Sequence, residues 1–416
     1  MTNLITTLGS NAKKALPQLA GASTQRINDV LEDIANQLIF KTNEILAANQ
    51  KDVEIAKDAG KDDAFIDRLS LTEERIEGIA QSVRNIKDLP DPVGEIISEN
   101  ERPNGLLIRK VRVPIGVIGM IYESRPNVTI DAACLCLKSH NTVVLRGGSE
   151  ALETNSIFHA VIVEALEKNK LSPHIVSFVD STDRQHVTDM LNAIEYVDVI
   201  IPRGGKGLTD KVMKDAKMAV FAHLDGICHI YVHQSAKPEI ARDVVVNAKM
   251  RRTGICGSAE TLLLDNETPP PQKKDIINQL IKSGCTVRGD ADLQALDKRV
   301  EPVTDEDWKT EYLAPIISIK VIDGVEDAIE HINKYGSHHT DSILAEDPET
   351  VELFLNNVDS GIVMHNTSTQ FADGGEFGMG AEIGIATGKL HARGPVALEQ
   401  LTTYKYHVLG NGQIRD

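Results

Sequence analysis

The sequence predicts an α/β protein in which a doubly wound parallel sheet is followed by a second α/β unit and accompanied by a small β arm. From Val113 to Arg203, short apolar strands alternate with segments of helix length. This alternation is typical of a parallel sheet that is buried on both faces. It resumes after His223. The arm is indicated by Asn104-Gly105, which separates two extended runs with charges on alternate residues, a strong signal for a hairpin with one solvated face.

Length and composition exclude several classes of protein. A chain of 416 residues suggests two or three domains. The 61 acidic residues outnumber the 44 basic ones, and the net charge of −17 argues against nucleic-acid and anionic-membrane partners. No window reaches the roughly 18 apolar residues of a membrane span, and the start of the chain lacks the apolar core of a signal peptide. We therefore expect a cytoplasmic protein.

The cysteine count points to a reducing compartment. The five cysteines show neither a secreted disulfide framework nor the paired spacing of a zinc site. We expect free thiols and no structural metal.

The N-terminal part is expected to be helical scaffold. Apolar residues at steps of three, four and seven from Ser23 to about Asn49 predict one long helix. A second helix is expected after Thr72, ending before Pro90. The last strand, L-T-T-Y-K-Y-H-V-L, has no obvious partner in either α/β unit, so we expect it to pair with the hairpin, in this chain or in a neighbouring one. A plain surface hairpin is the alternative.

Two strand ends in the doubly wound sheet are rich in glycine, namely Arg146-Gly147-Gly148-Ser149 and Arg203-Gly204-Gly205-Lys206-Gly207. Ligands of such sheets bind beyond the carboxyl ends of the strands. Neither run is a complete dinucleotide fingerprint or a phosphate-binding loop, so tight turns remain an alternative. An arginine beside bare backbone N–H groups suits a 2′-phosphate, which favours NADP over NAD.

Cys256 is the candidate nucleophile. It lies in a Gly-x-Cys-Gly turn between a predicted helix, Pro238 to Met250, and the strand E-T-L-L-L. Cations just before it, at Lys249, Arg251 and Arg252, would favour the reactive thiolate. A buried structural cysteine is the alternative. Downstream of Val363, glycine at almost every third position predicts a loop that approaches other groups closely.

Several blocks carry a resemblance to a known family. They are P-I-G-V-I-G-M-I-Y-E-S-R-P-N, N-T-V-V-L-R-G-G-S-E, H-L-D-G-I-C-H-I-Y-V, N-A-K-M-R-R-T-G-I-C, E-Y-L-A-P-I-I-S-I-K and Y-G-S-H-H-T. In this order they resemble the aldehyde dehydrogenase superfamily over nearly the whole chain. E-S-R-P-N, the cysteine block, F-A-D-G-G-E-F-G-M-G-A-E-I-G and K-L-H-A-R-G-P resemble, within it, the gamma-glutamyl phosphate reductase family of proline biosynthesis.

The resemblance implies an aldehyde dehydrogenase-like α/β fold with three parts. The NADP-binding domain would take residues 1–93 and 113–225, with part of 366–393 left open. The catalytic domain that carries Cys256 would take 226–365. The hairpin 94–112 and the C-terminal strand 399–412 would form the oligomerisation arm of a homodimer or homotetramer.

The resemblance also implies site residues. Cys256 matches the nucleophile, and Asn127 matches the residue that holds the oxyanion together with the cysteine's backbone N–H. The implied cofactor contacts are Arg146, Gly147, Ser149, Gly204, Gly205 and Glu311. The candidate substrate and phosphate contacts are Lys249, Arg252, Asp373 and Glu382. Structural alternatives remain for three of these residues: Asn127 as a helix cap, Arg146 in a surface ion pair and Glu311 as a solvated side chain.

One departure from the wider superfamily is informative about the reaction. Hydrolytic aldehyde dehydrogenases carry a general-base glutamate where this chain has His223. Without that carboxylate, water is poorly activated against a thioester, which favours phosphate as the acyl partner. Two smaller departures from the reductase family, Gly257 in place of asparagine and Asp341 in place of glutamate, affect site details.

The resemblance therefore implies NADPH-dependent reduction of L-glutamyl 5-phosphate to L-glutamate 5-semialdehyde and phosphate, through a thioester on Cys256. Another acylating or hydrolytic aldehyde dehydrogenase is the first alternative, and a catalytically silent scaffold of the same fold is the second. Because acyl phosphates hydrolyse readily, association with glutamate 5-kinase is a further expectation.

Overall fold

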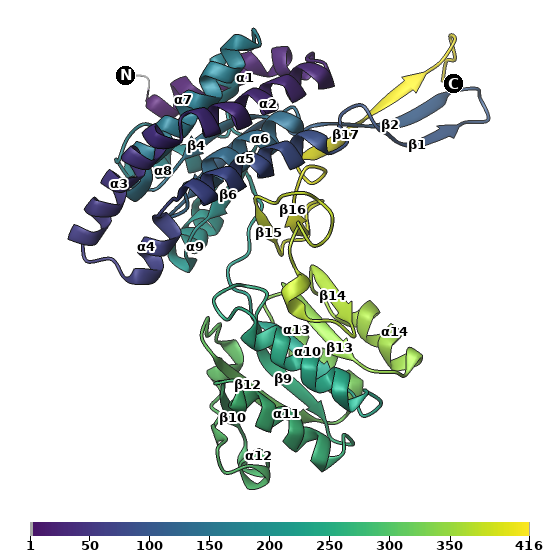
Figure 1. The fold of residues 1–416 in the computed structure, drawn as a ribbon. Helices are drawn as coiled ribbons and strands as arrows, with labels where there is room; N and C mark the ends of the chain where they lie inside the picture. The colour runs from purple at the N-terminus through teal and green to yellow at the C-terminus, as the bar shows by residue number, and fades with distance from the viewer. Residues whose placement is uncertain (1–2, 416) are drawn as a thin grey trace.

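The computed structural model describes residues 3–415 and consists of two α/β units with a β arm projecting from the first (Figure 1). The α-helices are α1 (Leu4–Ala20), α2 (Thr24–Phe40), α3 (Thr42–Asp58), α4 (Asp63–Leu69), α5 (Glu73–Asp88), α6 (Asn127–Lys138), α7 (Leu152–Lys168), α8 (Gln185–Leu191), α9 (Lys206–Asp215), α10 (Pro238–Met250), α11 (Pro270–Lys282), α12 (Ala291–Leu296), α13 (Gly324–Tyr335) and α14 (Pro348–Asn357). Short 3₁₀ turns occur at η1 (Ser149–Ala151), η2 (Pro173–Ile175), η3 (Asp307–Lys309) and η4 (Thr369–Phe371).

The strands form four sheets. They are β1 (Ile96–Glu101), β2 (Leu107–Pro114), β3 (Val117–Tyr122), β4 (Thr142–Arg146), β5 (Val176–Phe178), β6 (Val199–Arg203), β7 (Ala219–Val220), β8 (Cys228–Val232), β9 (Ala259–Asp265), β10 (Thr286–Gly289), β11 (Glu301–Pro302), β12 (Ile316–Ile322), β13 (Thr340–Leu344), β14 (Ile362–His365), β15 (Gly384–Ala386), β16 (Gly394–Val396) and β17 (Thr402–Leu409).

The first unit is a doubly wound parallel sheet, as predicted. Its strand order is β5-β4-β3-β6-β7, so the chain runs outward from β3 on one side and returns to β6 on the other. Residues of α2, α5, α6 and α7 form the core on one face, and residues of α1, α8 and α9 form the core on the other. The strand order reverses between β3 and β6, and ligands of such sheets bind in the crevice at that point.

The N-terminal helices differ from the prediction in one place. The single helix expected from Ser23 to Asn49 is wrong, because the chain turns at Lys41 and splits it into α2 and α3. The Thr42 hydroxyl donates to the carbonyls of Leu38 and Ile39, which competes with the helical hydrogen-bond ladder. Helix α5 begins as predicted after Thr72, whose side chain accepts from the Arg75 N–H at 3.1 Å.

The arm is a three-stranded antiparallel sheet with the order β1-β2-β17. The hairpin is confirmed, and its turn needs glycine at Gly105, where φ is +81°. Strand β17 pairs with β2 of the same chain along its whole length, from Thr402 opposite Pro114 to Leu409 opposite Leu107. The arm extends away from the first unit in Figure 1 and leaves the outer edge of β1 without a strand partner among the described residues.

The second unit is a parallel sheet with the order β11-β10-β12-β9-β8-β13-β14. Helices α10 and α11 contribute to the core on one face, and α13 and α14 to the core on the other. Residues 383–398 of the glycine-dense region, including β15 and β16, return to pack on the core of the first unit.

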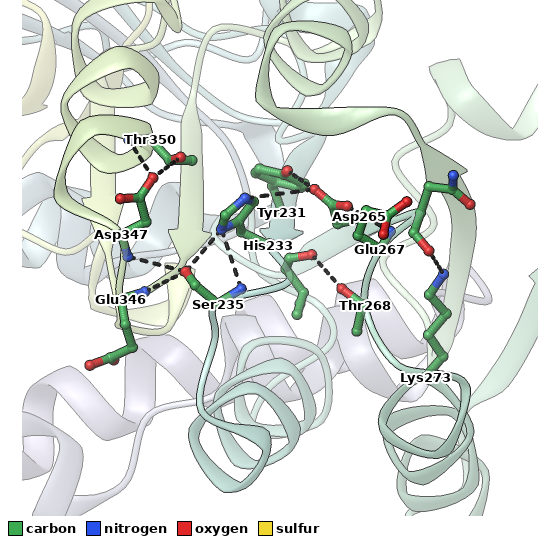
Figure 2. Close-up of polar contacts among 12 residues, drawn as sticks. Tyr231, His233, Ser235, Asp265, Glu267, Thr268, Lys273, Glu346, Asp347 and Thr350 are labelled. Carbon is green, nitrogen blue, oxygen red and sulfur yellow. Dashed lines mark hydrogen bonds and ion pairs between the residues drawn. The ribbon is translucent and has the colours of Figure 1, made fainter.

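At the carboxyl ends of β8, β9 and β13, the chain's own polar side chains bond to one another (Figure 2). The Tyr231 hydroxyl donates to Asp265, and the Ser235 hydroxyl oxygen accepts from the backbone N–H groups of Glu346 and Asp347 at 2.9 and 3.1 Å. These contacts tie strand ends and the start of α14 together. The amino ends of the same strands lie at the opposite edge, where Cys256 is found.

Among the described residues, no helix combines the length and the apolarity needed to cross a bilayer. The five cysteines form no disulfide with one another, which confirms the expectation of free thiols.

Candidate active site

Cys256 lies in the turn between α10 and β9 and is partly exposed, so the buried structural alternative is wrong. Its backbone is held by the segment that leads into β8. A Cβ atom at Gly226 would lie 2.2 Å from the Cys256 carbonyl oxygen, so only glycine allows this approach. The Cys228 thiol donates to the same carbonyl at 3.0 Å. The turn is thereby fixed at the amino edge of the second sheet.

Two histidines flank the thiol. The ligand atoms of His223, Cys256 and His339 all lie within 4.8 Å of one another. His223 uses Nδ1 to donate to the Ile385 carbonyl at 2.9 Å, which leaves Nε2 for the thiol. His339 is fully buried, and its Nε2 has no hydrogen-bond partner among the described residues. The spacing would also admit a thiophilic cation. We assign no metal, because two histidines beside a thiol equally suit a nucleophilic cysteine with a lowered pKa.

The histidines change the ionisation of the thiol. Burial by itself raises the pKa of Cys256, but the charge of His339 and the hydrogen bond and charge of His223 outweigh it and hold the pKa well below its usual range. Burial lowers the pKa of His223, whereas its contact with Cys256 and the Ile385 carbonyl raises it, and the net direction is upward. The arrangement therefore favours the thiolate of Cys256 and the protonated form of His223.

His339 was not among the predicted site residues. The available signal was its position in Y-G-S-H-H-T, just before β13. Strands β9, β8 and β13 are parallel neighbours, so the segments that precede them meet at one edge. That neighbour relation required the strand order, which local sequence patterns do not give.

We expect His339→Gln to reduce the reactivity of Cys256 below neutral pH. A depressed pKa keeps the thiolate populated until the pH falls through it, so removing one cationic neighbour should move the midpoint upward by about one pH unit or more. The measurement is the rate of iodoacetamide alkylation of Cys256 between pH 5 and 9. His338→Gln, at the adjacent position, is the control, and coincident profiles for all three proteins would refute the role of His339.

Asn127 is the first residue of α6, and Pro126 occupies the cap position, so the helix-cap alternative is wrong. The Asn127 amide donates from Nδ2 to Asp131 one turn later, at 2.9 Å. Burial raises the pKa of Asp131 to about 6. Asn127 lines a hollow together with Arg252, which belongs to the segment just before the Cys256 turn. The structure thus brings the predicted oxyanion residue and the cysteine segment together.

The predicted cofactor residues lie at the carboxyl ends of β4 and β6. Arg146 is buried and donates to the Gly147 carbonyl at 2.8 Å, while its Nε has no partner among the described residues. The surface ion-pair alternative is therefore wrong. Burial lowers the pKa of Arg146, and the nearby charge of Arg184 adds to this effect. Gly147 is buried, whereas Ser149 is exposed at the start of η1.

The other predicted cofactor residues lie in two places, Gly204 and Gly205 at the end of β6 and Glu311 ahead of β12. Gly204 and Gly205 are exposed between β6 and α9, and the Gly205 N–H donates to Glu123 at 3.0 Å. Glu311 accepts from the Gly226 N–H at 2.8 Å, and burial raises its pKa. Its carboxylate therefore contacts the same glycine that meets the Cys256 turn, and the solvated alternative is wrong.

Three of the four predicted substrate contacts have other partners. Lys249 is fully buried and paired with the equally buried Glu260, so the expectation that it steadies phosphate is corrected to a structural role. Asp373 accepts from the Gly375 N–H at 2.8 Å and Glu382 from the Gly374 N–H at 3.0 Å, which shapes the glycine-dense loop. Arg252 is exposed at the hollow. Asp341, one of the family departures, bonds to His229 and Ser360 in the interior.

Comparison with known proteins shows which family the chain resembles. The model of the aldehyde dehydrogenase family matches residues 5–292 and 300–406. The gamma-glutamyl phosphate reductase of Brucella suis biovar 1 (strain 1330) is 51% identical over 409 residues, covering 98% of this chain and 97% of that protein. The enzyme of the same name from Brucella anthropi is also 51% identical over 409 residues, covering 98% of this chain and 96% of its own.

The solved structures include a similar fold over the entire length. The crystal structure of gamma-glutamyl phosphate reductase from Thermotoga maritima superposes with a TM-score of 0.97 at 43% identity and covers 100% of both chains. The chain therefore belongs to the aldehyde dehydrogenase family, in the branch that contains the gamma-glutamyl phosphate reductases.

Proposed function

We propose that the protein reduces L-glutamyl 5-phosphate to L-glutamate 5-semialdehyde and phosphate with NADPH, in proline biosynthesis. The observation that carries the proposal is the Cys256 thiol held between His223 and His339 at the edge of the second sheet, an arrangement that lowers the pKa of the thiol. The relatives that are 51% identical bear the name of this activity.

The carboxyl ends of β3 and β6, where the strand order reverses, are the place that we assign to a nicotinamide dinucleotide. Helix α9 begins at Lys206, and no side-chain hydrogen bond caps it among the described residues. The Gly205 N–H already donates to Glu123, so the backbone N–H groups of Lys206 and Gly207 are the ones that a diphosphate would use. Arg146 has an unpartnered Nε, and Arg184 lies close enough to affect its pKa, so both cations suit a 2′-phosphate. When bound, NADPH supplies the hydride that reduces the thioester carbon.

The chain's own residues account for the other steps. The Cys256 thiolate attacks the carbonyl carbon of the acyl phosphate, forming the C–S bond while the carbonyl electrons move to oxygen. The Asn127 amide and the Cys256 backbone N–H hold that oxyanion, and Asp131 fixes the orientation of the amide. The oxyanion then collapses, the C–O bond to phosphate breaks, and phosphate leaves with its electron pair. After reduction, the C–S bond breaks, the semialdehyde is released, and the returning thiolate is stabilised by the two histidines.

The histidine at position 223 supports phosphate over water as the acyl partner. An imidazolium carries protons on both nitrogens and has no lone pair with which to deprotonate water. With Nδ1 bonded to the Ile385 carbonyl and its pKa raised, His223 is a poor replacement for a general-base carboxylate.

The reverse reaction provides the direct test. We expect glutamate semialdehyde to reduce NADP only when phosphate is present, and kcat/KM to favour NADP over NAD by about 10- to 100-fold because of the charge-assisted contacts to the 2′-phosphate. Absorbance at the nicotinamide band is followed with phosphate, coenzyme A or neither as the acceptor. Turnover with coenzyme A or water alone would favour the acylating or hydrolytic alternative. A Cys256 that resists iodoacetamide, together with no NADPH binding, would favour the silent scaffold.

Assembly is a separate part of the proposal. The arm exposes Ile96, Ile97, Tyr406 and Val408 beside the open edge of β1, a combination that invites strand pairing or packing with another copy. We expect a homodimer or homotetramer. Association with glutamate 5-kinase stays a prediction.

A further inference from the structure

A hollow of about 410 Å³ lies beside the Cys256 turn. It is formed by α4, α5, the start of α6 and the segment just before Cys256. The polar side chains that matter here are Arg68, Arg75, Arg125, Asn127, Asp131 and Arg252. Its volume is that of a small-molecule site, and the oxyanion residue of the proposed mechanism lies in its wall.

The hollow is lined by more cationic side chains than carboxylates. Arg75 is engaged, since its guanidinium donates to the Asp67 carboxylate and to the carbonyls of Asp67 and Ser70. The guanidiniums of Arg68, Arg125 and Arg252 have no hydrogen-bond or ion-pair partner among the described residues. In a chain with a net charge of −17, three unpaired arginines around one hollow indicate an anionic ligand.

The arginines are close enough to repel one another. Burial lowers the pKa of Arg125 to about 10, and the charges of Arg203, Arg68 and Arg252 contribute to this, while Cys256 opposes it. The hollow is therefore near the nucleophile. A carboxylate bound among these side chains would relieve the repulsion with charge-assisted hydrogen bonds.

The same hollow offers a site for a cation. The Asp131 carboxylate accepts from Asn127 at 2.9 Å and from the Ser82 hydroxyl at 3.4 Å, but no cationic side chain in the described part of the chain is paired with it. It is half-buried, and burial raises its pKa to about 6. An ammonium group bound beside it would stabilise the ionised form.

We propose that this hollow binds the α-amino acid end of the substrate, with Arg68, Arg125 and Arg252 receiving the α-carboxylate and Asp131 receiving the α-ammonium. This inference rests on the proposed function, and it replaces Asp373 and Glu382 as candidates for that end. The juxtaposition of unpaired guanidiniums and one unpaired carboxylate matches a zwitterion. Asn127 lines the hollow and is also the proposed oxyanion contact. A ligand whose amino acid end occupies the hollow would therefore have its carbonyl end near the reacting centre.

The test compares aldehydes that differ only at the amino acid end. L-glutamate 5-semialdehyde has both charges, 5-oxopentanoate has only the carboxylate, and pentanal has neither. Each is assayed with NADP and phosphate in the wild type, Arg252→Gln and Asp131→Asn. The matched control is Arg251→Gln, which removes the same charge from the adjacent residue, one that lies outside this hollow.

The expected result is a different pattern for each variant. Arg252→Gln should lower kcat/KM by about 10- to 100-fold for both carboxylates relative to pentanal, the cost of one charged hydrogen-bond partner. Asp131→Asn should lower kcat/KM by a similar factor for the semialdehyde relative to 5-oxopentanoate. Because Asp131 also orients Asn127, Asp131→Asn should lower kcat/KM for every aldehyde. The ratio of kcat/KM between two aldehydes cancels this shared loss. Arg251→Gln should leave the ratios unchanged.

A second measurement does not depend on turnover. L-norvaline, an amino acid of the same chain length without the reacting group, should protect Cys256 from iodoacetamide in the wild type. Protection should require at least about ten-fold more norvaline in either variant, whereas protection by pentanoate should weaken only in Arg252→Gln.

Two outcomes would overturn the inference. If Arg252→Gln raises the KM for phosphate while the substrate ratios stay constant, the arginines serve the phosphate and not the α-carboxylate. If both variants change all three aldehydes equally and norvaline protection is unaltered, the hollow does not bind the amino acid end. In both cases phosphate-dependent turnover by the wild type persists, whereas its absence with every aldehyde would be the failure of the proposed function itself.

Discussion

Replacing Cys256 by alanine should reduce phosphate-dependent turnover by at least about 10⁴-fold, because the variant has no nucleophile to form the thioester. NADPH binding should be retained, since all the predicted cofactor contacts except Glu311 lie at the ends of β4 and β6, away from the Cys256 turn. Reduction of NADP by glutamate semialdehyde measures the first property, and quenching or transfer of protein fluorescence on NADPH addition measures the second.

The control for this variant is another thiol of the same chain. Cys285 lies in the core of the second unit, where burial raises its pKa to about 12. Cys285→Ala should therefore keep both turnover and iodoacetamide sensitivity. Turnover by Cys256→Ala within ten-fold of the wild type would remove the thioester from the mechanism.

The second large effect concerns stability. Lys249→Met should lower the free energy of unfolding by about 3–5 kcal/mol near pH 8, because it leaves the buried Glu260 carboxylate without its cation. Burial raises the pKa of Glu260 to about 7 even with the Lys249 ammonium opposing it, and without that ammonium the pKa should rise further. The folded variant then retains a proton that the unfolded chain has lost above its ordinary pKa of about 4.3.

This difference sets the sign of the pH dependence. Where the folded state binds more protons than the unfolded state, stability falls as the pH rises. The deficit of Lys249→Met should therefore be smaller at pH 5 than at pH 8. Urea unfolding at both pH values and one protein concentration measures it.

The double variant Lys249→Met with Glu260→Gln tests whether the loss of stability comes from the unpaired Glu260 carboxylate. It should recover at least half of the lost stability, because the glutamine carries no charge that must be buried. A Lys249→Met protein of normal stability with a raised KM for phosphate would instead restore Lys249 as a phosphate contact.

Local patterns predicted the elements best where a strong periodicity met a clear boundary residue. Helix α10 has the predicted bounds, Pro238 to Met250, because proline suits the first turn and the apolar stripe fills the rest. The hairpin at Asn104-Gly105 followed from one turn type. The same periodicity gave a wrong prediction at Lys41, where the chain turns between α2 and α3. The apolar residues continue across the turn because both helices pack against the same core.

The site was predicted unevenly for a related reason. Cys256 and Asn127 were found because glycines, cations and family blocks surround them, whereas Lys249 belonged to the same block but points into the interior and pairs with Glu260. Which cation of a cluster faces solvent depends on the rotation of α10 against its sheet. His339, Arg68 and Arg125 were not among the predicted site residues, because each is unremarkable in its own segment, whereas Arg252 was a candidate from its place before Cys256.

Periods, caps and turn chemistry act over a few residues, so the sequence was enough to predict the alternation of strands and helices, a doubly wound first unit, the arm and the turn that holds Cys256. The packed fold was needed to show that His223 and His339 meet at the cysteine and that Arg68, Arg125 and Arg252 line one hollow with Asp131. These contacts depend on which strands become neighbours and on how the helices are rotated against the sheets. Both depend on how the whole apolar surface packs into the core.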